Sequence, residues 1–224
     1  GVSTGIAIIA AEEEIVDQIV LTNEQGLIGG VPSSDAGAAV NYTSIVDQPY
    51  QFDFYDGGGL DLAFLSFAEV DAAGSVNVSR FNGRIIGVGG FINISQHAKK
   101  VIFSGTFTAG SVEIAWPNAK TVITKEGRFT KFVSQLEQVS YNGAFAQERG
   151  QEALYITERA VFQRGEYGIE LIEIAPGIDL DRDILAHMDF KPHISQDLKT
   201  MDVRLFREEA MGLAEDLAGK EPCN

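Results

Sequence analysis

Short apolar stretches that end in glycine-rich turns recur through the first half of the chain, and this feature constrains the fold most strongly. Residues 19–22 lead into a segment with three glycines at positions 26–30, and residues 84–86 lead into a Gly-Val-Gly-Gly turn at 87–90. Strands that alternate with turns and short helices are typical of an α/β sheet. We therefore expect an α/β fold through about residue 110.

The pattern changes further along the chain. Residues 111–174 alternate apolar and polar side chains and contain a Gly-rich turn near 165–168, which predicts a β-meander or hairpin stack. Two C-terminal helices are predicted after it, at 179–188 and at 196–217.

Three further elements are expected nearer the N-terminus. Residues 3–14 predict a helix capped by Ser3 or Thr4, and residues 19–22 and 100–107 each predict a strand. A sheet protein that begins with a helix leads us to expect another strand upstream of Gly1.

Composition limits the class of protein and its partners. The chain has 224 residues, of which 45% are apolar and 22% are charged, as in an ordinary compact globular protein. Its 32 acidic and 17 basic residues give a formal charge of −15, which argues against nucleic acid and an anionic membrane as partners. With no Pro-, Gly- or Ser-rich linker, we expect one domain over residues 1–213 and a polar tail over residues 214–224.

Cysteine and histidine usage gives no sign of a metal site. Cys223 is the single cysteine, so an internal disulfide or a thiolate metal site cannot form. The spacings of His97, His187 and His193 fit no compact metal site. We expect no bound metal, and a cytoplasmic location.

Glu24 is the first candidate for chemistry. It follows the apolar residues 19–22 and precedes Gly26, Gly29 and Gly30, so a carboxylate is expected at the carboxyl end of a strand, with little side-chain bulk around it. Such ends hold ligands in open α/β sheets, and carboxylates can act as nucleophiles. A solvated turn residue is the alternative interpretation of Glu24.

The turn at residues 87–90 is the second candidate. The backbone amides of Gly89 and Gly90 could point at an oxyanion or a phosphate, since glycine allows a ligand to approach the backbone closely. A tight turn without a ligand is the alternative. A dinucleotide site is not indicated, because the fingerprint helix and its acidic residue are missing.

Read together, four ordered segments resemble the family I coenzyme A transferases, within them the acetate and propionate branch. The segments are Glu24-Gln25-Gly26-Leu27-Ile28-Gly29-Gly30-Val31-Pro32, Tyr50-Gln51-Phe52-Asp53-Phe54-Tyr55-Asp56-Gly57-Gly58-Gly59-Leu60-Asp61, Gly87-Val88-Gly89-Gly90-Phe91-Ile92-Asn93-Ile94 and Gly105-Thr106-Phe107-Thr108-Ala109-Gly110. The likeness covers nearly the whole chain up to about Leu213. It departs from many relatives at Ser3, where they carry a second glycine, and at Gln25, where they carry serine.

The resemblance implies the C-terminal, glutamate-bearing half of such an enzyme, with an open CoA-transferase-like sheet flanked by helices, a β-meander or hairpin region and C-terminal helices. It implies Glu24 as the nucleophile and the amides of Gly89 and Gly90 as oxyanion donors. It further implies coenzyme A as substrate and covalent intermediate, with no permanently bound cofactor. The residues implied to contact coenzyme A are Gly26, Gly29, Gly30, Gly87, Val88 and Phe91.

The implied activity is transfer of CoA between a short-chain acyl-CoA and a carboxylic acid, by a ping-pong route through a glutamyl-CoA thioester. The implied partners are acyl-CoA, short-chain carboxylic acids, the N-terminal half of the same enzyme and further copies in a homo-oligomer. Two alternatives stay open. The chain could be a CoA-binding or assembly half without activity of its own, or a thioesterase on the same scaffold.

Overall fold

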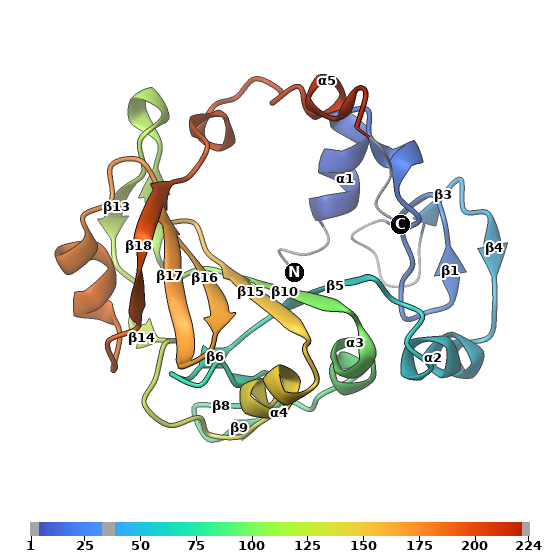
Figure 1. Ribbon diagram of the computed structural model, residues 1–224, viewed down its shortest axis with the longest axis horizontal. Coiled ribbons are helices and arrows are strands. Elements are labelled where there is room, and N and C mark those ends of the chain that lie inside the picture. Colours follow the sequence, from blue (N-terminus) through green and yellow to red (C-terminus); the bar gives the residue numbers. More distant parts are fainter. Residues whose placement is uncertain (1–4, 33–38, 221–224) are drawn as a thin grey trace. The chain divides into compact units, whose positions relative to one another are not determined.

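The computed structural model describes residues 5–32 and 39–220 (Figure 1). The chain forms two compact units. Residues 55–206 make up the larger, which we call the sheet unit, and residues 1–54 with 207–224 make up the smaller, which we call the hairpin unit.

One six-stranded sheet organises the sheet unit (Figure 1). In pairing order its strands are β18 His193–Thr200, β17 Gly168–Ile174, β16 Ala160–Gly165, β15 Glu152–Ile156, β10 Lys100–Ser104 and β5 Leu62–Ser66. β5, β10 and β15 are parallel, β15 to β17 form an antiparallel meander, and β18 is parallel to β17. The predicted α/β class is therefore confirmed, and the meander lies inside the region where alternation predicted it.

One face of β10 and β15 lies in the core. Val101 and Phe103 of β10 are fully buried, as is Tyr155, the residue in register with Phe103 on β15. The rings of Phe103 and Tyr155 stack with centroids 5.4 Å apart, and those of Phe107 and Phe132 stack at 4.7 Å. Burial of such large rings, together with their offset contacts, stabilises the sheet.

Shorter elements complete the sheet unit. They are the helices α3 Phe91–His97 and α4 Gly143–Glu148, the strand pairs β6 Glu69–Val70 with β7 Val76–Asn77, β8 Arg80–Phe81 with β9 Arg84–Ile85, β11 Thr108–Ala109 with β14 Phe129–Thr130 and β12 Glu113–Ala115 with β13 Val122–Lys125, and the helical turns Pro117–Ala119, Leu180–Ile184, Leu185–His187 and Val203–Phe206. Asn142 caps α4, since its side chain accepts a hydrogen bond of 3.0 Å from the amide of Phe145.

The hairpin unit contains short helices and two-stranded sheets. Its elements are α1 Gly5–Glu12, the helical turn Val16–Gln18, the pairs β1 Leu27–Ile28 with β4 Ser44–Ile45 and β2 Val31–Pro32 with β3 Ala39–Val40, α2 Gln48–Asp56, whose last two residues belong to the sheet unit, and α5 Leu213–Leu217. The buried carboxylate of Glu13 accepts hydrogen bonds from the amides of Met211, Gly212 and Leu213 at 2.6, 2.9 and 3.0 Å. One side chain therefore joins the two chain segments of this unit.

The predicted helix at 196–217 is wrong. Residues 193–200 instead form β18, which pairs with β17 at the edge of the sheet. Gly212 has φ +78°, a left-handed conformation that no helix interior contains, so only the short α5 follows it. Pairing with a sheet edge outweighed the apolar spacing on which the helix prediction depended.

The predicted strand at 19–22 is also wrong. Only Thr22 pairs there, through a single bridge to Ile28, and Val20 is 79% exposed. An apolar run indicates a strand when burial accompanies it, and residues 19–22 are exposed or only half-buried.

Other predicted elements are present with altered bounds. The first helix is α1, whose predicted caps Ser3 and Thr4 lie outside the described residues. The predicted helix at 179–188 is a π-helical turn followed by a 3₁₀ turn, and the strand predicted at 100–107 ends at Ser104. No helix within residues 5–32 and 39–220 is long and apolar enough to span a lipid bilayer.

Candidate active site

Glu24 lies at the tip of a tight hairpin. The amide of Gly26 donates a hydrogen bond of 3.1 Å to the carbonyl oxygen of Asn23, and the amide of Asn23 donates one of 3.2 Å to that of Leu27. These bonds close a three-residue loop of Glu24, Gln25 and Gly26, in which Gly26 has φ +98°. A turn followed by a left-handed glycine is a common hairpin connection, so the local sequence suffices to fix this backbone.

The three glycines around Glu24 are required by the chain's own packing. Gly26, Gly29 and Gly30 have φ values of +98°, +76° and +69°. A Cβ atom on Gly26 would overlap the carbonyl oxygen of Val46, and those on Gly29 and Gly30 would overlap atoms within residues 40–43. The glycines thus shape the loop that presents Glu24, which is a reason for them that needs no ligand.

Glu24 is half-buried, and no hydrogen bond or ion pair joins its carboxylate to another described residue. It is therefore free to act on a ligand. The expectation that Glu24 ends a strand of the main sheet is wrong, because it sits in a turn of the hairpin unit and residues 19–22 form no strand.

The turn at 87–91 has different properties. Gly87 and Gly89 have φ values of +91° and +52°, and a Cβ atom on either would meet nothing within 4 Å. The amides of Val88, Gly89 and Gly90 donate to no other described group, while the amide of Phe91 donates to the carbonyl oxygen of Val88 at 3.2 Å. Free amides in open space at the start of α3 are suited to binding negative charge.

Phe91 anchors this turn. It is 7% exposed, and its ring stacks on the core ring of Phe103 with centroids 5.8 Å apart. The free amides are thereby tied to the rigid sheet.

The structure brings the predicted site residues together in two groups. The first is Glu24, Gly26, Gly29 and Gly30 in the hairpin unit, and the second is Gly87, Val88, Gly89, Gly90 and Phe91 in the sheet unit.

A further polar cluster lies at the carboxyl ends of β10 and β15, where open α/β sheets hold ligands. The Nζ atom of Lys131 donates a hydrogen bond of 2.9 Å to the carbonyl oxygen of Thr106, and Glu158 accepts one of 2.8 Å from the amide of Phe107. The buried Oγ atom of Ser104 has no partner among the described residues. The sequence pointed to this place only through the segment at 105–110, because Lys131 and Glu158 approach it from distant positions in the chain.

Lys131 is unusually placed for an ammonium group. It is 5% exposed, and its Nζ atom lies 3.8 Å from the centroid of the Phe67 ring. Burial lowers the pKa of Lys131 to about 8, and the attraction of Glu158 opposes that change.

Beside this cluster, Arg159 forms a buried ion network. Its fully buried guanidinium pairs with Glu126 and Glu158, each at 2.7 Å, and donates to the carbonyl oxygen of Asp183 at 3.0 Å. Burial opposes ionisation of Glu126, but hydrogen bonds from Arg159 and Thr108 outweigh it and lower the pKa of Glu126. The network fixes the backbone after β15.

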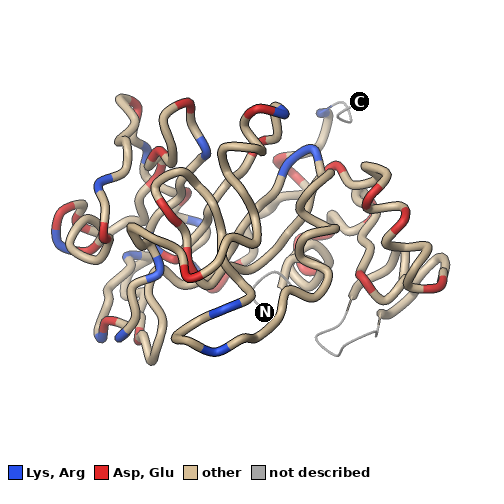
Figure 2. The backbone as a smooth tube through the Cα atoms, turned by 90° about the horizontal axis from the view of Figure 1, so that it is seen from below, with Lys and Arg blue, Asp and Glu red and all other residues tan. Residues whose placement is uncertain are grey.

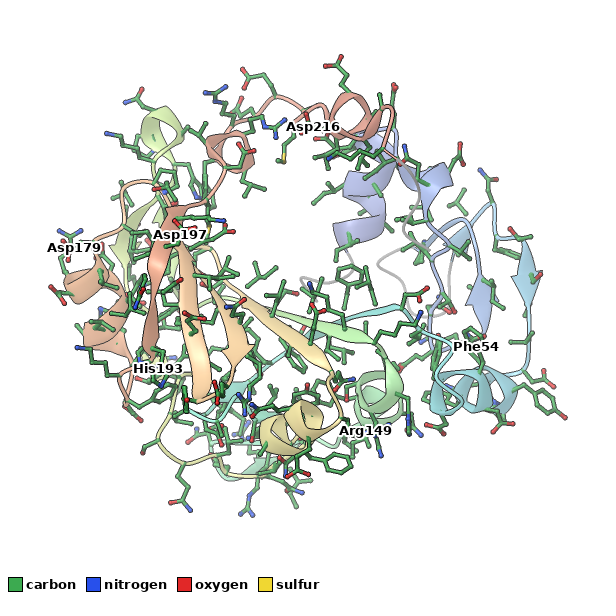
Figure 3. All side chains as sticks on the ribbon, viewed as in Figure 1. Phe54, Arg149, Asp179, His193, Asp197 and Asp216 are labelled. Carbon is green, nitrogen blue, oxygen red and sulfur yellow. The ribbon has the colours of Figure 1, made fainter. Side chains whose placement is uncertain are left out.

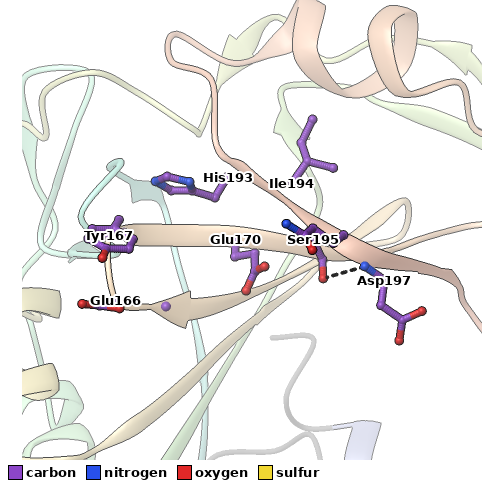
Figure 4. Close-up of a pocket in the computed structure, with 10 residues that line it drawn as sticks. Glu166, Tyr167, Glu170, His193, Ile194, Ser195 and Asp197 are labelled. Atoms are coloured by element: carbon purple, nitrogen blue, oxygen red, sulfur yellow. Dashed lines mark hydrogen bonds between the residues drawn. The ribbon is translucent and has the colours of Figure 1, made fainter.

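A hollow of about 530 Å³ lies between the β16–β17 turn and β18 (Figure 4). His193 and Asp197 line it from β18, as Figures 3 and 4 show, and Glu166, Tyr167 and Glu170 line it from the turn and β17. Tyr167 is 75% exposed, so the hollow is open to solvent. It contains none of the predicted site residues.

Acidic, basic and metal-ligating side chains are spread along the described ranges. No group of three or more His, Cys, Asp or Glu side chains among residues 5–32 and 39–220 could hold a metal ion. Figure 2 shows Lys and Arg interspersed with Asp and Glu along the described chain.

Comparisons with known proteins place these features in context. No protein-family model matches the sequence. The chain is 53% identical over 214 residues to the acetate CoA-transferase YdiF of Escherichia coli K12, and 46% identical over 220 residues to the caffeate CoA-transferase of Acetobacterium woodii. Each alignment covers 95% of this chain, but only 40% and 42% of the relative.

A solved structure agrees with these alignments. The crystal structure of the E. coli O157:H7 acyl-CoA transferase YdiF, a thioester complex with CoA, matches with a TM-score of 0.91 at 52% identity. The match covers 95% of this chain and 40% of that one, so this chain spans less than half the length of its relatives.

Proposed function

Because the chain belongs to the family I coenzyme A transferases, we propose that it carries the nucleophilic glutamate of an enzyme that moves CoA between a short-chain acyl-CoA and a carboxylic acid. The observation that carries this proposal is Glu24, a carboxylate without a described partner on a hairpin whose glycines fix its backbone. We assign this role to residues 1–213, as the glutamate-bearing domain.

The proposed reaction has two covalent intermediates. The Glu24 carboxylate attacks the acyl-CoA carbonyl carbon and the C–S bond breaks. This step forms a mixed acyl-glutamyl anhydride and releases CoA as a thiolate. The thiolate then attacks the glutamyl carbonyl carbon, which gives a glutamyl-CoA thioester and releases the first acid as a carboxylate. A second carboxylate reverses these steps, so neither water nor an oxidant is consumed.

A carboxylate is a weak nucleophile, so the negative charge that develops on the carbonyl oxygen must be stabilised. We propose the amides of Gly89 and Gly90 as donors to this oxyanion, which their free hydrogen-bonding capacity supports. Loss of one donor in comparable sites lowers kcat by about 10² to 10³.

Contacts to coenzyme A are divided in this proposal. Gly87 and Val88 are proposed to contact it, since the space beside Gly87 and Gly89 is open. Phe91 is proposed to contact it only through its backbone, because its ring is buried against Phe103. Gly26, Gly29 and Gly30 are proposed to contact coenzyme A only through their backbone atoms, beside Glu24. Apolar neighbours such as Leu27, which is 7% exposed, would help to exclude the water that hydrolyses either intermediate.

The principal test is covalent trapping in the full-length enzyme. Acyl-CoA followed by borohydride should reduce the glutamyl thioester, and peptide mass spectrometry should find the change at Glu24 alone. Glu24→Gln should abolish it, whereas Glu12→Gln, an exposed acid on α1, should not. A label at another residue, or none at all, would refute the assignment.

A second candidate is favoured by the coverage of relatives, of which this chain spans only 40%. The chain alone would then be a CoA-binding or assembly half, active only when joined to an N-terminal half. Activity assayed with and without that half separates the two. Free CoA released without an acceptor acid would instead indicate a thioesterase. We propose that the full-length enzyme is a homo-oligomer, as the family resemblance implies, and that it is located in the cytoplasm.

A further inference from the structure

The loop at residues 105–108 follows β10, the middle of the three parallel strands. Its first amide, that of Gly105, donates to the carbonyl oxygen of Ile156 on the neighbouring strand at 3.1 Å. The loop therefore begins at the carboxyl edge of the sheet, and the proposed reaction gives it no role so far.

One peptide group in this loop is held at both ends. The carbonyl oxygen of Thr106 accepts from Lys131 at 2.9 Å, and the amide of Phe107, in the same peptide group, donates to Glu158 at 2.8 Å. A peptide plane with both polar groups engaged cannot rotate without breaking a charge-assisted hydrogen bond. The direction of the backbone from Ser104 to Phe107 is thus set by two side chains from elsewhere in the fold.

Space is tight around the ammonium group. A Cβ atom on Gly105 would lie 2.9 Å from the Nζ atom of Lys131, and the ring of Phe67 covers another side. An apolar side chain could fill this space without the cost of desolvating a charge, so stability alone does not explain a lysine here.

A polar group that lacks a partner lies at the start of the same loop. The Oγ atom of Ser104 is buried and makes no hydrogen bond to a described residue. Ser66 stands next to Ser104 in register on β5 and is exposed. Buried hydroxyls are normally paired, so an unpaired one at a ligand-binding edge indicates a missing partner.

We propose that Lys131 and Glu158 are positioning residues that hold the loop at 105–108 in the form that binds the thiol arm of acyl-CoA, and that Ser104 donates a hydrogen bond to an amide carbonyl of that arm. The inference rests on the proposed CoA-transferase function. It adds a second binding segment, at the carboxyl edge of the sheet, to the turn at 87–91.

The test compares KM values in the full-length enzyme. Ser104→Ala removes one oxygen that has no described partner, so the midpoint of thermal unfolding should not fall. Its KM for acyl-CoA should rise roughly three- to tenfold, the worth of one hydrogen bond, while the KM for the acceptor acid stays unchanged. With an acyl thioester of a truncated thiol that lacks the two amide groups of the CoA thiol arm, the KM values of wild type and variant should be equal.

Lys131→Met should likewise raise the KM for acyl-CoA and leave the KM for the acceptor acid unchanged, again without a lower midpoint of thermal unfolding. Lys125→Met is the matched control, because Lys125 is exposed and its ion-pair partner among the described residues is the exposed Glu113. Unchanged KM values for acyl-CoA in both variants would overturn the inference, and so would equal losses for both substrates, since that marks a merely structural role. Trapping at Glu24 in wild type tests the proposed function separately, so either idea can fail alone.

Discussion

Replacement of Lys131 by methionine gives the sharpest physical prediction. The pKa of Lys131 falls from the ordinary 10.5 to about 8 in the folded chain, mainly because of burial. At about 1.4 kcal/mol per pKa unit, the folded state pays about 3 kcal/mol to keep this lysine protonated at neutral pH. Loss of the hydrogen bond to Thr106 in the variant costs about 1 kcal/mol. At pH 7 we therefore expect Lys131→Met to be as stable as wild type or more stable.

The pH dependence has a definite sign. Between pH 8 and 10.5 the unfolded chain binds one more proton at this lysine than the folded chain, so the free energy of unfolding rises with pH. Below pH 8 both states are protonated, and above pH 10.5 both are neutral. The stability of wild type relative to Lys131→Met should therefore rise by about 3 kcal/mol across this window and stay level on either side.

Urea unfolding at a series of pH values measures this difference. Trp116 is the single tryptophan and lies in the sheet unit with Lys131, so its fluorescence reports the unfolding of that unit. Other groups titrate nearby, among them Tyr141, whose pKa burial raises to about 12, but they cancel between wild type and variant. Parallel stability curves for the two proteins from pH 7 to 10.5 would refute the reasoning.

Three further predictions concern the supports of the site. Arg159→Met leaves two partly buried carboxylates without their guanidinium partner and should lower the free energy of unfolding by about 3 to 5 kcal/mol in urea titrations, whereas exposed Arg182→Met should change it by less than about 1 kcal/mol. Gly26→Ala should abolish trapping at Glu24, because the added methyl group would overlap the carbonyl oxygen of Val46. Gly83→Ala, at a position with φ +72° and open space, should leave trapping intact. Glu13→Gln should weaken three backbone hydrogen bonds, lower stability by about 1 to 3 kcal/mol and speed proteolysis near residues 207–213, and unchanged cleavage rates would contradict it.

Local chemistry made some of the structure predictable. Alternation of apolar and polar residues identified the β15–β17 meander, since side chains of a strand alternate between two faces whatever lies around them. The glycine-rich turn after Glu24 was likewise predictable from its own neighbours, because a hairpin with a left-handed glycine is set by four or five residues. The role of Glu24 stays a prediction that the family resemblance implies.

The remainder depended on contacts between distant segments. The ammonium of Lys131 meets a carbonyl 25 positions earlier in the chain, and Arg159 meets Glu126 across 33 positions. The residues next to Lys131 and Arg159 in the sequence do not predict these contacts. Residues 193–200 form a strand for the same reason, because they pair with the edge strand β17, and their own sequence does not indicate that pairing.

The glycines near Glu24 and those of the turn at 87–91 are needed for different reasons. Around Glu24 every added methyl group would strike the chain itself, so these glycines are needed before any ligand arrives. At Gly87 and Gly89 an added methyl group would strike nothing within 4 Å, and only the positive φ values resist it. Open space beside free amides is of use only to a molecule that comes from outside the fold. The chain itself therefore fixes the loop that presents Glu24, the proposed nucleophile, while the turn at 87–91 keeps backbone amides without a described partner, as the proposed contact with a substrate requires.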